Sequence, residues 1–319
     1  MNKLMVAGLA VLCLAPLLLP VVMATTDEFP NWAYPVDPPA APGSKAPKDD
    51  GTLVHVPDSD VALSRAQIDG GQVPDWHPDD HPAMPDIVKN GRQDVRACAY
   101  CHQPSGAGRP ESASLAGLSV NYIKEQIETF KKGDRKGSEP KRAPQNMMNQ
   151  IAAKLTEEEI EAAANYFSSL KLGSFVKIVE TDTAPKTFVT GGMLAKSPEG
   201  GTEPIGNRII EVPEDLERAV NRDPRTPFIA YVPKGSLRKG ETFVTGGATP
   251  CITCHGPDLH GRGDVPHIAG RSPSYIVRQL YDIQKGKRLG AVAPMQQVVA
   301  DFTLDDMVAI AAYVASREP

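Results

Sequence analysis

Apolar side chains recur at helical spacing in three well-separated segments of the chain. In each segment the apolar or aromatic positions lie three or four residues apart. They are Tyr122, Ile123, Ile127 and Phe130; Ile160, Ala163, Ala164 and Phe167; and Met307, Ile310, Ala311 and Val314. Such spacing predicts amphipathic helices that bury one face. Thr156 and Thr303 each precede acidic residues, which is typical of a helix N-cap, so the starts of the second and third helices are defined.

A different pattern occupies the rest of the chain. Between residues 173 and 235, short β-branched or aromatic runs alternate with Gly and Pro, at residues 175–179, 187–190, 208–212 and 228–232. These runs predict strands, and hence a β-rich insertion. Residues 25–88 are proline-dense and nearly without period, which predicts an irregular extension. Its segment 73–82 holds an aromatic residue and two histidines, and we interpret it as a loop docked on the folded body in preference to a metal site.

The two helical regions repeat one another at a constant offset of 153 residues. No gap is needed in either copy. The offset carries Cys98, Cys101 and His102 to Cys251, Cys254 and His255. It also carries Tyr122, Gln126 and Arg135 to Tyr275, Gln279 and Arg288. A repeat of this length predicts one fold used twice. We therefore predict a mainly α protein with small helical domains at residues 89–172 and 236–319. The β-rich insertion 173–235 joins them, and the proline-rich N-terminal extension 25–88 precedes them.

Each copy contains the motif C-x-x-C-H. Two thiols three residues apart on a helical turn can add to the two vinyl groups of a haem, and the adjacent imidazole becomes the proximal iron ligand. A single motif could also belong to a thioredoxin-like or zinc site, whereas two copies in one chain favour haem. We predict two covalently bound haem c groups. Their attachment residues are Cys98, Cys101, Cys251 and Cys254, and their proximal ligands are His102 and His255.

A methionine occupies the same position in both copies. Met295 stands eight residues before the N-cap Thr303, and Met148 stands eight residues before Thr156. Methionine is more often a flexible core residue than a ligand, but a haem iron with one histidine has a second axial position. We predict Met148 and Met295, in loops between two helices, as the second ligands, with Met147 as the alternative to Met148.

Four further side chains recur on or just after the helix that follows the C-x-x-C-H motif in each copy. They are Tyr122, Arg135, Tyr275 and Arg288. A buried haem keeps two anionic propionates that need hydrogen-bond donors, which these residues could supply. The alternative is that the tyrosines pack in the core and the arginines lie on a solvated surface. Both interpretations stay open at this point.

The chain starts with the features of an export signal. Lys3 is followed by an apolar run, and residues 22–24 end in a small residue suited to cleavage. We predict a signal peptide at residues 1–24 and a periplasmic location; the alternative is an uncleaved membrane anchor. Apart from Cys13, every cysteine belongs to a C-x-x-C pair, so none is left for a structural disulfide. A net charge of −5 provides no electrostatic reason to bind nucleic acid.

In these features the chain resembles class I cytochromes c in tandem, the soluble dihaem cytochromes c of bacteria. The shared motifs are C-x-x-C-H, a downstream Ala-Gly, a Tyr-x-x-x-Gln helix, a Lys-Gly-x-Arg close, the methionine position and a terminal amphipathic helix. They cover residues 90–172 and 236–319. The resemblance implies two class I cytochrome c-like helical haem domains. It also implies electron transfer between dehydrogenases or membrane complexes and terminal oxidases or reductases. The insertion leaves open whether the two domains pack closely.

With histidine and methionine on both irons, neither iron has an open site. We therefore predict a carrier of single electrons that takes no small-molecule substrate and meets periplasmic or membrane redox proteins. One alternative is a dihaem enzyme, either a peroxidase or a thiosulfate dehydrogenase-like protein. Another is the electron-accepting cytochrome subunit of a dehydrogenase complex. The paired methionines disfavour a peroxidase, because peroxide needs an iron that opens.

Overall fold

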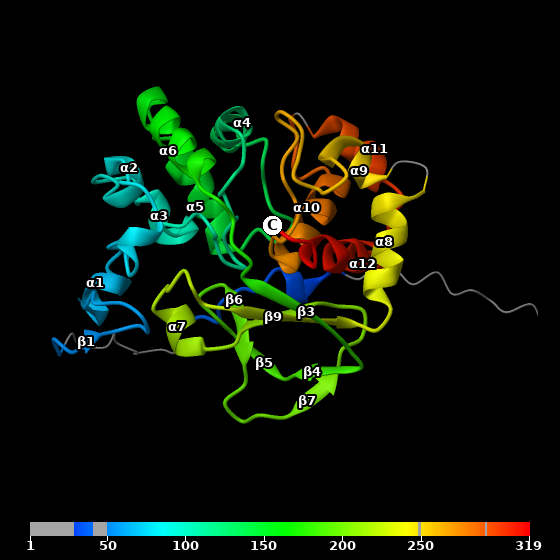
Figure 1. The fold of residues 1–319 in the computed structure, drawn as a ribbon, viewed down its shortest axis with the longest axis horizontal. Helices are drawn as coiled ribbons and strands as arrows, with labels where there is room; N and C mark the ends of the chain where they lie inside the picture. The colour runs from blue at the N-terminus through cyan, green and yellow to red at the C-terminus, as the bar shows by residue number, and fades with distance from the viewer. Residues whose placement is uncertain (1–28, 41–49, 248–249, 291) are drawn as a thin grey trace, which may run out of the picture.

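A computed structural model describes residues 29–40, 50–247, 250–290 and 292–319. Figure 1 shows two groups of helices on one side of a layer of strands. The predicted signal peptide, residues 1–24, lies outside the described residues. Within the described ranges, no helix combines the length and the apolar character that crossing a membrane requires.

The first group of helices contains the first C-x-x-C-H motif. Its helices are α2 (Asp86–Lys89), α3 (Cys98–His102), α4 (Val120–Lys131), α5 (Ala143–Ala152) and α6 (Glu157–Ser169). The predicted stripes of α4 and α6 face each other, so that Ile123 and Phe167 lie in one core. Thr156 caps α6 as predicted, and Glu159 completes a reciprocal capping box with it.

The second group repeats this arrangement around the second motif. Its helices are α8 (Ser236–Thr245), α9 (Cys251–His255), α10 (Pro273–Gln284), α11 (Ala293–Val299) and α12 (Leu304–Ala315). The stripe predicted for α12 is buried, including Met307 and Ile310, and Thr303 caps the helix. Helix α8 approaches α12 so closely that a Cβ at Gly240 would lie 2.1 Å from the Ala309 carbonyl oxygen. This contact therefore requires glycine.

Strands occupy the chain between the two groups. They are β3 (Val176–Thr181), β4 (Thr183–Pro185), β5 (Thr187–Thr190), β6 (Met193–Lys196), β7 (Thr202–Pro204), β8 (Ile210–Pro213) and β9 (Phe228–Pro233), with the short helix α7 (Leu216–Val220) before β9. Strand β9 is central, since it pairs parallel to β3 and antiparallel to β8. Strands β4 and β7 form one antiparallel pair, and β5 and β6 form another. The four apolar runs of the sequence correspond to β3, β5, β8 and β9.

The N-terminal part of the chain has short elements where the sequence predicted only irregular structure. They are η1 (Asn31–Ala33), β1 (Leu53–Val54), β2 (Leu63–Ser64), α1 (Arg65–Asp69) and η2 (Pro78–Asp80). Near η1, the Tyr34 hydroxyl donates to Asp282 Oδ1 at 2.7 Å. Farther along, the Trp76 indole donates to the Asn221 carbonyl oxygen at 2.7 Å. The segment 73–82 is thus a docked loop, as interpreted from the sequence.

The two helical groups meet directly. Lys136 N donates to Lys287 O at 2.7 Å, and Leu289 N donates to Asp134 O at 2.9 Å. These two bonds are equivalent under the 153-residue repeat, so the contact has approximate two-fold symmetry. The strands lie to one side of both groups and do not hold them apart (Figure 1). Close packing of the domains, which the sequence left open, is therefore present.

Candidate functional site

Both C-x-x-C-H motifs form one-turn helices, α3 and α9, whose cysteines lie on a single turn. None of these four cysteines is joined to another described residue by a disulfide. Burial raises the pKa of Cys98 to about 12 and that of Cys251 to about 11, so both are protonated at neutral pH. The two cysteines of each motif have the spacing that addition to two vinyl groups requires.

The two motif histidines are oriented in the same way. His102 Nδ1 lies 2.8 Å from the Ala113 carbonyl oxygen, and His255 Nδ1 lies 2.8 Å from the Pro266 carbonyl oxygen. A carbonyl oxygen only accepts, so Nδ1 carries the proton and Nε2 keeps its lone pair. Burial lowers the pKa of both imidazoles, which keeps them neutral. A neutral imidazole with Nδ1 held by a backbone carbonyl is the typical state of a metal-ligating histidine.

The loop after each histidine depends on glycine. Gly108 N donates to His102 O at 3.1 Å, and Gly261 N donates to His255 O at 2.7 Å. Both glycines have positive φ, +67° and +83°. A Cβ on Gly108 would lie 2.5 Å from the Ala113 carbonyl oxygen, the group that orients His102. The 153-residue repeat relates Gly108 to Gly261, and the positive φ and the close backbone contact give the reason for glycine at both positions.

The structure places Met148 in α5 and Met295 in α11, whereas the sequence predicted loops. Both side chains are half-buried. Met148 packs on the same core cluster as Cys98 and Cys101, and Met295 packs on the cluster that includes Cys251. Met147 does not belong to the first cluster. Attachment thiols and a thioether thus share one core in each domain, which fits a haem c held by the predicted residues.

The recurring tyrosines and arginines lie at the interface between the two domains. Each arginine crosses over: Arg135 Nη2 donates to the Tyr275 hydroxyl at 3.0 Å, and Arg288 Nη2 donates to the Tyr122 hydroxyl at 2.8 Å. Arg135 and Arg288 are 7% and 6% exposed. A solvated surface position, one of the two alternatives for these arginines, is therefore wrong, because the domain contact removes both side chains from solvent.

Two glutamines complete this network. Gln126 Oε1 accepts from Arg135 at 2.7 Å and from Arg288 at 2.9 Å, and Gln279 Oε1 accepts from the same two arginines at 2.9 and 3.0 Å. No described carboxylate forms an ion pair with either guanidinium, and Arg288 Nε is buried without a partner. Burial and the charge of Arg288 both lower the pKa of Arg135. Two adjacent buried cations held only by neutral acceptors fit a site that takes up anionic groups.

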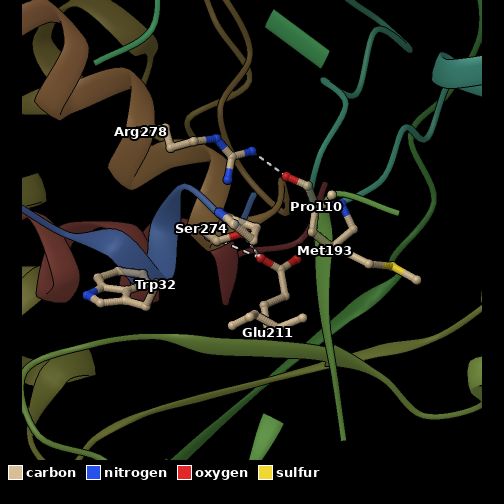
Figure 2. Close-up of a pocket in the computed structure, with 9 residues that line it drawn as sticks. Trp32, Pro110, Met193, Glu211, Ser274 and Arg278 are labelled. Carbon is tan, nitrogen blue, oxygen red and sulfur yellow. Dashed lines mark hydrogen bonds between the residues drawn. The ribbon is translucent and has the colours of Figure 1, made fainter. Parts of the chain in front are cut away.

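A small cavity, lined by apolar residues and by Glu211, Ser274 and Arg278, lies where the strands meet the second domain (Figure 2). Glu211, from β8, accepts hydrogen bonds from the Ser272 hydroxyl at 2.8 Å and from Ser274 N at 3.1 Å, at the start of α10. Arg278 lies beside it and donates to the Pro110 carbonyl oxygen of the first domain. Burial raises the pKa of Glu211. Sequence reasoning missed this junction, because its members have no spacing pattern in common.

Comparisons with known proteins identify a matching family and several relatives. The cytochrome c family model matches residues 88–171. Cytochrome c-554(548) of Halomonas halodenitrificans is 31% identical over 80 residues, which cover 25% of this chain and 90% of that protein. A thiosulfate dehydrogenase electron acceptor of Thiomonas intermedia (strain K12) is 25% identical over 228 residues, 70% of this chain and 80% of the relative. Cytochrome c4 of Pseudomonas aeruginosa is 23% identical over 229 residues, 70% of this chain and 85% of the relative. The chain therefore belongs to the cytochrome c family, among the dihaem class I cytochromes.

Proposed function

We propose that this protein is a periplasmic carrier of single electrons with two covalently bound haem c groups, each iron held by one histidine and one methionine. The axial pairs are His102 with Met148 and His255 with Met295. The observation that carries the proposal is the repeated site: a buried neutral imidazole with Nδ1 bound to a backbone carbonyl, and a thioether packed on the same core as the attachment thiols. Family membership supports electron transfer through haem c in general.

Haem c, when bound, supplies a one-electron ferric/ferrous couple. The residues of this chain hold it so that little rearranges. The carbonyls of Ala113 and Pro266 hold the imidazoles in one orientation, and the glycine turns hold these carbonyls in place. A buried site with fixed ligands disfavours the additional positive charge of the ferric form, so the reduction potentials are expected to be high.

The interface network is the proposed binding site of the haem propionates. Tyr122, Arg135, Tyr275 and Arg288 hydrogen-bond across the two domains, and the two guanidiniums carry positive charge without a described ion-pair partner. Propionates from both haems would supply the missing negative charge. This arrangement would bring both haems to the domain interface, where an electron could pass between them.

The partner that the comparisons favour is a dehydrogenase. The Thiomonas intermedia relative is named as an electron acceptor of thiosulfate dehydrogenase, and it aligns over 70% of this chain. We propose that this protein likewise accepts electrons from a periplasmic dehydrogenase that oxidises a sulfur compound. Mixing the oxidised cytochrome with such a dehydrogenase and thiosulfate, and following haem reduction by stopped-flow absorbance, tests the proposal. Rapid reduction supports it, and no reduction by an active dehydrogenase refutes it.

Ligand substitution tests the haem assignment. The purified exported protein should contain two haems per chain that acid-acetone does not extract, and its reduced form should not bind carbon monoxide. Met148→Ala and Met295→Ala should each open one iron to carbon monoxide, while the neighbouring control Met147→Ala should open none. Carbon monoxide binding by the unmodified reduced protein, or its rapid reaction with peroxide, would contradict the closed-iron carrier and favour a dihaem enzyme.

A further inference from the structure

The two haem-attachment helices differ in what covers them. In α3, Tyr100 is buried and Cys101 is half-buried; in α9, the equivalent Thr253 and Cys254 are exposed. The difference comes from the chain between the domains. Arg222, between α7 and β9, contacts Tyr100 of α3, whereas no hydrogen bond or ring contact joins residues 173–235 to α9 among the described residues. The repeat is therefore symmetric in the residues that hold haem and asymmetric in what surrounds them.

Arg222 makes the contact between this segment and α3. Its Nη1 donates to the Tyr100 carbonyl oxygen at 3.0 Å, and its guanidinium carbon lies 4.0 Å from the centroid of the Tyr100 ring. No ion pair to Arg222 is found within the part of the chain that the structure describes. The positive charge of Arg222 therefore lies against α3, the helix that carries the attachment residues of the first domain.

The backbone holds Arg222 in a costly conformation. Its φ is 59°, in the left-handed region, where a Cβ lies too close to the following carbonyl oxygen. Such a residue persists only where the surroundings determine its position, and it is often found at functional sites. The conformation aims the side chain at α3 while both neighbours in the chain stay buried.

Those neighbours are anchored by the N-terminal extension. Asn221 O accepts from the Trp76 indole at 2.7 Å, and Asp223, fully buried, lies 3.1 Å from His77 Nε2 and accepts from Arg218 at 2.7 Å. Because Asn221 and Asp223 are both buried and hydrogen-bonded, the backbone of Arg222 between them is held in one conformation. The docked loop 73–82 thereby sets the position of a charge against α3.

Other charges near Cys101 do not replace that of Arg222. Arg109 is paired with Glu111 at 2.9 Å, so the two largely cancel. Arg96 also stacks on Tyr100, at 4.6 Å, but it is exposed and its field is screened by solvent. Arg222 is half-buried and unpaired, so its field is the less screened of the two.

We propose that Arg222 is a positioning residue that raises the reduction potential of the first haem and leaves that of the second unchanged. The inference rests on the proposed function, because it requires a haem on Cys98 and Cys101. A ferric haem carries one more positive charge than a ferrous haem, so a fixed nearby cation favours the ferrous form. The first haem would then hold the electron more strongly than it would without the insertion.

A redox titration of the full-length haem-loaded protein tests the inference. Arg222→Gln should lower the equilibrium constant for reduction of the first haem by about tenfold, equal to about 59 mV for one electron. Arg222→Lys keeps the charge and should retain most of the potential. Arg225→Gln is the matched control: it removes one charge from the same segment, but Arg225 is exposed and paired with Asp80 at 2.7 Å. Arg225→Gln should leave the reduction potentials of both haems unchanged.

The first haem's wave is identified as the one that Met148→His displaces and Met295→His does not. An unchanged first wave in Arg222→Gln, or equal shifts of both waves, would overturn the inference. A shift in Arg222→Lys as large as in Arg222→Gln would also overturn it, because the cause would then be loss of the cover over α3. If the Arg222→Gln protein does not accumulate, Arg222→Met is used, because it removes the charge and keeps an unbranched side chain of similar length. Haem content is measured first, so a protein without haem refutes the proposed function and not the role of Arg222.

Discussion

Replacing Arg135 with leucine is a direct test of the interface network. The side chain donates three hydrogen bonds, to Tyr275, Gln279 and Gln126. Both glutamines would keep Arg288 as a donor, so the hydrogen bond to Tyr275 would be lost without replacement. A hydrogen bond to a charged group contributes about 1.5–3 kcal/mol. Removing an unpaired buried cation also removes its desolvation cost. Without a bound anion, the net destabilisation would therefore be small, at most about 1–3 kcal/mol.

A propionate at the network changes that magnitude. Arg135→Leu would then leave a buried carboxylate without its cation, and breaking one side of a buried ion pair costs about 3–5 kcal/mol. We expect that larger loss for the haem-loaded protein, measured by urea unfolding followed through both far-ultraviolet circular dichroism and haem absorbance. Arg288→Leu should behave alike. The double variant should lose less than the sum, because the two arginines share Gln126 and Gln279.

Lys136→Leu is the matched control for Arg135→Leu. It removes one positive charge at the next position of the same loop, but its side chain is exposed and its interface bond is made by the backbone. Its effect should stay within about 0.5 kcal/mol. A destabilisation below about 3 kcal/mol for Arg135→Leu in protein that retains both haems would refute the propionate assignment.

Three further changes test other parts of the structure. Thr303→Ala removes the N-cap of α12 and should lower the free energy of unfolding by about 1 kcal/mol in urea titrations, with the m-value unchanged. Gly108→Ala places a Cβ 2.5 Å from the Ala113 carbonyl oxygen and should prevent stable haem incorporation, measured by haem content per chain. Gly133→Ala, which has φ +73° and no atom within 4 Å of its Cβ, should cost only about 1–2 kcal/mol and keep the haem; equal effects of the two would contradict the role given to Gly108. Burial raises the pKa of Glu211 above its ordinary 4.5, so its contribution to stability is present below pH 4.5 and is lost as pH rises through the raised pKa. Glu211→Gln should therefore flatten that decline in stability in thermal melts taken across pH. An unchanged slope in the variant would contradict the role given to Glu211.

Short-range features of the fold were predictable from the sequence. The helices α4, α6 and α12 and the caps Thr156 and Thr303 depend on residues within a few positions of each other, so their signals are complete in a local window. The orientation of His102 and His255 was not predictable, because each accepting carbonyl lies eleven residues away in an irregular loop. The helices around the methionines were predicted as loops, and Pro144 and Pro294 lie at their starts. Proline is tolerated in the first turn, where both lie.

The position of the recurring arginines is the clearest limit of the sequence. Periodicity showed that Arg135 and Arg288 recur, and left open whether they face a haem or solvent. Only the packing of one domain on the other brings Arg135 to Tyr275, 140 residues away. Arg222 carried no signal at all, since it lies outside the repeat and its left-handed backbone follows from anchors at Trp76 and His77.

By itself, the sequence determined the two attachment motifs, their 153-residue repeat and the helices that carry them, because covalent chemistry and helical period act between near neighbours. Tertiary structure alone decided the crossed arginine network, the direct contact of the two domains and the asymmetric cover of the first attachment helix. Each of these depends on groups far apart in the chain, and their contacts form only when burial of apolar surface brings the separate segments together.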